Sequence, residues 1–108
     1  MRSVEDLHRD YRVAFLTHVA SRDEASLHAG YRVGRRAVED GFTLLDLARI
    51  HHEVFRQALA ETRPADLEDL VDAASQLFLE VLSTWQMVIG AARTGARPGH
   101  EPDPPRLR

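Results

Sequence analysis

The segment GYRVGRRAVEDG, residues 30–41, sets the geometry of the expected fold. When residues are placed at 100° per step, Gly30 and Gly34 share the apolar side of one helix. Each glycine costs about 1 kcal/mol of helix propensity relative to alanine. A pair spaced four residues apart on the buried side therefore predicts a close helix crossing, because a missing side chain lets a second backbone approach.

Capping signals on both sides of this segment predict four helices, over residues 3–20, 22–40, 43–62 and 65–94. The first three are preceded by a capping oxygen that lies three residues before an acid: Ser3 and Asp6, Ser21 and Glu24, Thr43 and Asp46. Gly41 and Gly95 stand where a left-handed residue ends a helix, and Pro64 stands where a first turn tolerates proline. No segment alternates as a strand does, so the chain reads as all-α.

Each predicted helix carries an apolar stripe with helical spacing. The stripe of the first comprises Val4, Leu7, Tyr11, Ala14 and Phe15. That of the second comprises Leu27, Tyr31, Val33, Ala37 and Val38, and that of the fourth comprises Leu67, Leu70, Val71, Ala74, Leu77, Phe78, Val81, Leu82, Trp85, Val88 and Ile89. Four such helices joined by short loops predict a four-helix bundle over residues 1–94, followed by a disordered Pro- and Gly-rich tail over residues 95–108.

Composition narrows the class of protein. The 108 residues are 44% apolar and 29% charged, which is globular usage, and the net charge of −3 gives no electrostatic case for nucleic acid or an anionic membrane. The absence of cysteine excludes disulfides, thiolate zinc sites and cysteine nucleophiles. The charged N-terminus and the lack of a long apolar run predict a soluble, cytoplasmic protein.

One segment resembles a set of metal ligands or catalytic groups: it contains His51, His52 and Glu53 in succession. On a helix, however, these three neighbouring side chains point in different directions. His51 is expected to face the core, His52 the edge and Glu53 the solvent. A zincin would need a histidine where this chain has Arg56.

No other set of residues matches a metal site. A di-iron bundle needs two inward Glu-x-x-His pairs, and the sequence offers only Glu5 with His8. His18 lies on an apolar face and could meet His51 in the core. We therefore expect no metal, no cofactor and no catalytic residues. His18 and His51 are predicted to be polar core residues, His51 bonding Tyr31 or a carbonyl.

Some apolar residues fall outside the stripes. Leu79 and Met87 lie on the polar side of the fourth helix, beside the small Ser83. Val13, Leu16 and Ala20 form a second ridge on the first helix. Two such ridges predict two interfaces, one for a partner and one for self-association.

The stretches GYRVGRRAVEDGFTLLDLARIHHEVFRQAL (30–59) and AASQLFLEVLSTWQMV (73–88) resemble the N-terminal domain of RsbU-type serine phosphatases. These are PP2C-like regulators of bacterial stress-response sigma-factor pathways, and the resemblance covers about residues 7–90. The C-terminal domain of the clock protein KaiA is similar in fold at a greater distance.

The resemblance implies a dimeric four-helix bundle that binds a GHKL-type switch kinase, RsbT, whose docking activates the attached phosphatase. His28, Leu79 and Ser83 match the positions that contact this kinase, and Met87 extends the same surface. Val13, Leu16 and Ala20 are the candidate dimer ridge.

The sequence departs from that family after the fourth helix. The phosphatases continue into a helical linker and a metal-dependent catalytic domain, whereas prolines 98, 102, 104 and 105 interrupt any helix here. The chain is then either an excised domain with an altered tail or, as we favour, a stand-alone binding module. Two alternatives are a small-ligand sensor with Tyr11, His18, Tyr31 and His51 lining a core cavity, and a purely structural dimerisation domain.

Overall fold

The computed structural model describes residues 3–95. They form four α-helices, α1 (Val4–Ser21), α2 (Glu24–Glu39), α3 (Leu44–Glu61) and α4 (Leu67–Gly95), with a short 3-10 helix, η1 (Pro64–Asp66), before α4. Between residues 3 and 95 no strand occurs, so the all-α prediction is confirmed. The predicted tail lies outside the described residues except for Gly95, which belongs to α4.

Two of the three predicted capping boxes are present. Ser3 and Thr43 each form a capping box, with Asp6 and Asp46 respectively. The predicted box of Ser21 with Glu24 is wrong, because α1 continues through Ser21.

The turn between α1 and α2 uses two residues that the prediction overlooked. Arg22 takes the left-handed conformation, at φ 56°, and its N–H donates to the His18 carbonyl. Asp23 then caps α2 by accepting from the Ser26 N–H at 2.8 Å. The second helix therefore starts two residues later than expected.

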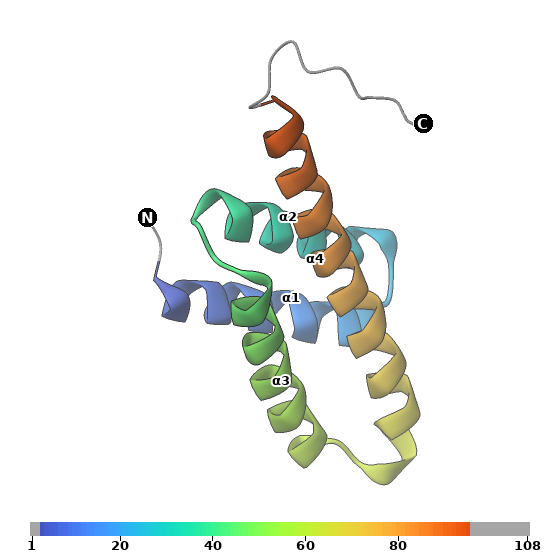
Figure 1. The fold of residues 1–108 in the computed structure, drawn as a ribbon. Helices are drawn as coiled ribbons and strands as arrows, with labels where there is room; N and C mark the ends of the chain where they lie inside the picture. Colours follow the sequence, from blue (N-terminus) through green and yellow to red (C-terminus); the bar gives the residue numbers. More distant parts are fainter. Residues whose placement is uncertain (1–2, 96–108) are drawn as a thin grey trace, which may run out of the picture.

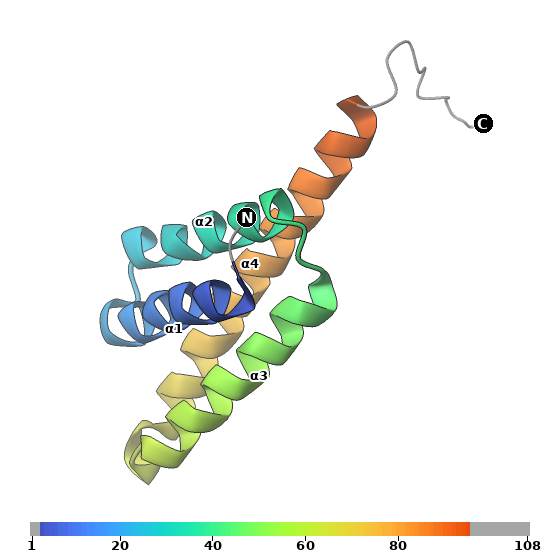
Figure 2. The ribbon, with the colours of Figure 1, turned by 90° about the vertical axis from the view of Figure 1, so that its left-hand side faces the viewer.

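The helices form two hairpins that cross (Figure 1). The α1–α2 hairpin lies across the pair formed by α3 and α4, and the most extensive contact joins α2 to α4. Figure 2 shows α1 and α2 side by side, with α4 crossing them and its last turns extending beyond the other helices. The fold is thus a four-helix arrangement in which the longest helix, α4, contacts each of the other three.

Two glycines allow the crossing of α2 and α4. A Cβ atom at Gly30 would lie 2.7 Å from Leu77 Cδ1, and one at Gly34 would lie 2.6 Å from the Val81 carbonyl oxygen and 2.9 Å from Thr84 Cβ. Real Cβ atoms do not approach other heavy atoms so closely. The predicted close crossing is therefore confirmed.

The loop between α2 and α3 is held by its own glycine and by α4. Gly41 adopts a left-handed conformation at φ 82°, as its position after a periodic run predicts. The indole N–H of Trp85 donates to the Phe42 carbonyl at 3.1 Å. This bond ties the loop to α4.

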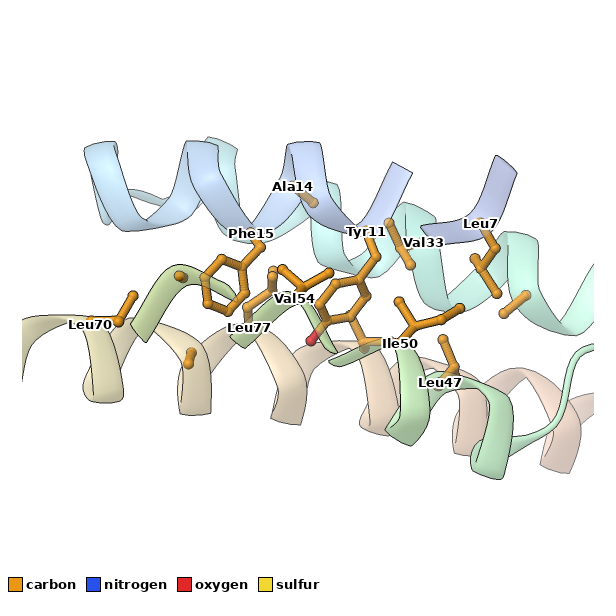
Figure 3. Close-up of a cluster of buried hydrophobic side chains, with 14 residues drawn as sticks. Leu7, Tyr11, Ala14, Phe15, Val33, Leu47, Ile50, Val54, Leu70 and Leu77 are labelled. Atoms are coloured by element: carbon orange, nitrogen blue, oxygen red, sulfur yellow. The ribbon is translucent and has the colours of Figure 1, made fainter. Parts of the chain in front are cut away.

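All four helices contribute to one core (Figure 3). Its buried apolar residues include Leu7, Tyr11, Phe15, Val33, Leu47, Ile50, Val54, Leu70, Leu77 and Val81. Val4 and Val71 were expected in the stripes but are each 44% exposed. Val4 begins α1, at the edge of the core. On α4 the buried side is turned toward α2, since Thr84 packs against Gly34 and is buried while Val71 is not.

Substituting the glycines tests this crossing. Gly34→Ala should lower the free energy of unfolding by about 1–3 kcal/mol, because the new methyl meets backbone that cannot move aside. Gly30→Ala should have a smaller effect, since its nearest neighbour is the end of a leucine side chain.

Gly90→Ala is the matched control. It lies in α4 with nothing within 4 Å of its Cβ position, so alanine should stabilise the helix by up to about 1 kcal/mol. Urea denaturation of the three variants measures the order. Equal effects at positions 34 and 90 would contradict the close crossing.

Candidate partner-binding face and buried histidines

His51 bonds to Tyr11, not to Tyr31. The Tyr11 hydroxyl lies 2.6 Å from His51 Nδ1, and the Tyr11 side chain is fully buried. The prediction of Tyr31 as a partner is wrong because Tyr31 lies on the outer side of α2. There its ring stacks on exposed His28, with centroids 5.1 Å apart, and its hydroxyl accepts from Arg35 at 3.4 Å.

Aromatic rings surround the partly buried imidazole of His51. It stacks on Phe78, with ring centroids 3.9 Å apart and planes 6° apart, and lies beside Phe55. Burial lowers the pKa of His51 from 6.5 to about 4, and the nearby charge of His52 adds to the effect. Burial also raises the pKa of Tyr11. Tyr11 therefore stays protonated, and its O–H donates a hydrogen bond to Nδ1 of the neutral His51.

His18 is buried in a different part of the molecule. Its side chain is 2% exposed, and its two ring nitrogens face Ser26 of α2 and Gln76 of α4. His18 and His51 thus have separate partners. Because Tyr11 and His51 bond directly and Tyr31 lies at the surface, the four side chains proposed to line a sensor cavity do not converge.

The other polar residues of the histidine segment diverge. His52 and Glu53 are both exposed, and Glu53 Oε1 lies 3.3 Å from His8 Nε2 of α1. Across residues 3–95, no group of three or more His, Asp or Glu side chains is placed to hold a metal ion.

The four residues predicted to contact a partner are all exposed on α2 and α4, and we call this set the docking face: His28, Leu79, Ser83 and Met87. Leu79 and Met87 are each 63% exposed. A hollow between the start of α2 and α4 is lined by Leu79 and Ser83 together with Leu27 and Glu80, and His18 and Gln76 also reach it. His28 and Met87 do not line this hollow.

Leu27 is a residue of this hollow that the sequence analysis did not include among the partner contacts. It was counted with the apolar stripe of its helix, but it is partly exposed beside Leu79. Its position within that stripe gave no signal of this exposure, which depends on where α4 crosses α2. The hollow therefore has an apolar wall on each helix.

Val13, Leu16 and Ala20, the α1 ridge, are exposed on the side of α1 away from the core. Val13 lines a hollow between α1 and α2, whereas Leu16 lines another between α1 and α3 with Val54 and Ala58. The ridge thus separates two shallow grooves.

Exposed apolar residues also occur on α3, where none was expected. Leu45 is 60% exposed, and Leu44 and Leu59 are exposed to a lesser degree. None of the described helices has the length and apolar character needed to cross a bilayer.

One family of known proteins matches this chain. The model for the N-terminal domain of phosphoserine phosphatase RsbU matches residues 9–88, which include the glycine crossing and the docking face. No curated protein and no solved structure matches the chain.

The pH dependence of stability tests the environment of His51. Above pH 6.5 the ring is neutral in the folded and unfolded states, so its contribution to stability is fully present. As the pH falls from 6.5 toward 4, the unfolded chain binds a proton that the folded protein resists, and this contribution is lost.

His51→Phe keeps a flat ring against Phe78 but cannot titrate. The free energy of unfolding should therefore fall less steeply in His51→Phe than in the wild type between pH 6.5 and 4. His52→Gln is the control and should keep most of the wild-type slope, because burial is the larger cause. Urea denaturation at several pH values measures this, and identical slopes for wild type and His51→Phe would refute the assignment.

Proposed function

The chain belongs to the family of RsbU N-terminal domains, and we propose that it is a non-catalytic module that binds a GHKL-type switch kinase through the docking face. The family is the N-terminal, regulatory domain of a phosphatase and not its catalytic part. The observation that carries the proposal is the exposure of Leu79 beside small Ser83. The resemblance to the phosphatases assigns the kinase contact to these two positions.

The docking face has the composition of a protein-binding surface. Leu79 and Met87 supply exposed apolar area, and Leu27 adds an apolar wall from the neighbouring helix. Ser83 is small enough to let a partner backbone approach. Burial of a leucine side chain contributes about 1.5–3 kcal/mol, so Leu79 alone can account for a large share of a moderate affinity.

The docking face is carried by two closely packed helices and not by loops. The hollow lies between α2 and α4, the two helices that cross at Gly30 and Gly34. The capped α1–α2 turn is the loop that borders it. A surface held in its bound shape loses little conformational entropy on binding. We infer that the kinase docks on a preformed face.

The position of the face on α4 suggests how docking is transmitted. Leu79, Ser83 and Met87 follow one another along α4, whose last turns extend beyond the other helices (Figure 2). In the phosphatases that the sequence resembles, this helix continues toward the catalytic domain. We propose that a kinase on this face acts directly on that helix in a partner-switching pathway.

Leu79→Asp should weaken binding of the switch kinase of the same genome at least about tenfold, since the buried apolar contact is replaced by a desolvated charge. Leu45→Asp is the matched control, because Leu45 is 60% exposed but lies on α3. Titration calorimetry measures the affinities, and circular dichroism checks that both variants fold.

The outcomes separate the location of the face from the identity of the partner. If the kinase binds wild type and Leu79→Asp equally, the docking face is misplaced. If it binds neither, the proposed partner is wrong, and a structural dimerisation domain becomes the better description.

We further propose that the chain forms a homodimer through the α1 ridge of Val13, Leu16 and Ala20. A symmetric contact presents each residue twice, so a charge at one position is repeated across the interface. Leu16→Glu should therefore shift the equilibrium to folded monomer.

Val71→Glu is the control for this substitution, because Val71 is similarly exposed but lies on α4. Sedimentation velocity at tens of micromolar measures the assembly state. A monomeric wild type, or a dimer that tolerates Leu16→Glu, would rule out this interface.

A further inference from the structure

A network of polar side chains joins three helices behind the docking face. His18 of α1 lies at its centre and is almost completely buried. Its Nδ1 is 2.8 Å from Ser26 Oγ of α2, and its Nε2 is 3.0 Å from Gln76 Oε1 of α4. Both ring nitrogens therefore have a partner at hydrogen-bond distance.

The contact with Gln76 decides whether Nε2 of His18 carries a hydrogen. Gln76 Oε1 also accepts from the Nε–H of Arg22 at 3.2 Å, so the atom that faces His18 is the amide oxygen. An amide oxygen can only accept. His18 Nε2 must consequently carry a hydrogen and donate it to Gln76.

The contact with Ser26 permits two arrangements of hydrogens. The hydroxyl of Ser26 has one hydrogen and two acceptors within reach, His18 Nδ1 at 2.8 Å and the Asp23 carbonyl oxygen at 2.9 Å. When Ser26 donates to Nδ1, His18 is neutral. When Ser26 donates to the Asp23 carbonyl, Nδ1 must itself carry a hydrogen and donate to Ser26 Oγ, and His18 is then a cation.

Neither arrangement leaves a buried polar atom without a partner. The Asp23 carbonyl accepts from the Leu27 N–H at 3.1 Å in both, so it does not depend on Ser26. The change requires one proton from solvent at Nδ1 and rotation of one hydroxyl. A buried polar group is destabilising when a partner is lost, and here none is lost, so the cost that remains is the desolvation of the charge.

We propose that His18 is a proton-binding site that changes the charge behind the docking face without unfolding the domain. His18 and Gln76 reach the same hollow as Leu79 and Ser83, so the added charge lies directly beneath the proposed kinase contact. His51 offers a contrast: its Nδ1 is engaged by the Tyr11 hydroxyl and its ring is stacked on Phe78.

Charged groups of both signs line this hollow. Arg22 at the end of α1 is basic and shares the Gln76 oxygen with His18, whereas Asp23 and Glu24 at the start of α2 and Glu80 on α4 are acidic. The hollow also supplies a route for the proton from solvent. The proton site is a property of this domain alone and does not depend on the identity of the partner. If a partner docks here, its affinity and the protonation of His18 must influence one another.

Nuclear magnetic resonance of the ¹⁵N-labelled imidazoles in the full chain tests the proposal between pH 8 and pH 5, the interval in which histidine is the side chain that changes charge. At high pH, Nε2 of His18 should be protonated and Nδ1 unprotonated. On acidification Nδ1 should gain a hydrogen while circular dichroism remains that of the folded protein. His18→Gln identifies the resonances, and through-bond correlations to the backbone identify them if that variant does not fold.

Gln76→Glu provides the matched variant. A carboxylate at this position still accepts from Nε2 and Arg22 but stabilises the cation, so the midpoint of proton uptake should move up by about one pH unit or more. An Nδ1 that stays unprotonated until the fold is lost would overturn the proposal. So would protonation at Nδ1 instead of Nε2 at high pH, or a midpoint unaffected by Gln76→Glu.

Discussion

The close contact of α2 with α4 is the constraint on which the other features depend. With no side chain at Gly34, the Val81 carbonyl comes so near that a Cβ atom there would lie 2.6 Å from it. This proximity buries Thr84, whose hydroxyl is satisfied by the Glu80 carbonyl at 2.8 Å. It also places Leu27 and Leu79 on opposite walls of one hollow. The position of this hollow therefore follows from the way α2 and α4 pack in the core.

His18 and His51 show how the environment of a histidine decides its chemistry. His51 is enclosed by aromatic rings, which offer it no group that would compensate a positive charge, so its pKa is lowered to about 4. It acts as a neutral acceptor for Tyr11 and joins α3 to α1. His18 faces a hydroxyl and an amide, which can accept hydrogens from both of its ring nitrogens. One histidine thus links two helices in its neutral form, and the other is the proposed proton-binding site behind the docking face.

The two proposed contact surfaces, the docking face and the α1 ridge, lie on different helices. The proposal of a partner and the proposal of a dimer are therefore compatible with one another. The exposed leucines of α3, above all Leu45, add apolar area that neither surface uses. A small domain has too little polar surface to cover itself, so such residues do not by themselves indicate an interface. For Leu79, family membership and position on the crossing helices supply the additional argument.

The sequence alone determined the number of helices, most of their ends and the glycine crossing, because capping residues and 3.6-residue periodicity act over a few neighbouring positions. It also separated the directions of His51, His52 and Glu53, since these follow from helix geometry.

Tertiary structure decided the rest. Tyr11 bonds His51 because α1 packs against α3, 40 residues away in the chain, whereas Tyr31 is turned outward. Val71 is exposed because α4 turns its buried side toward α2. His18, Ser26 and Gln76 meet only where three helices converge, and no local pattern encodes a contact that three separate segments must form together.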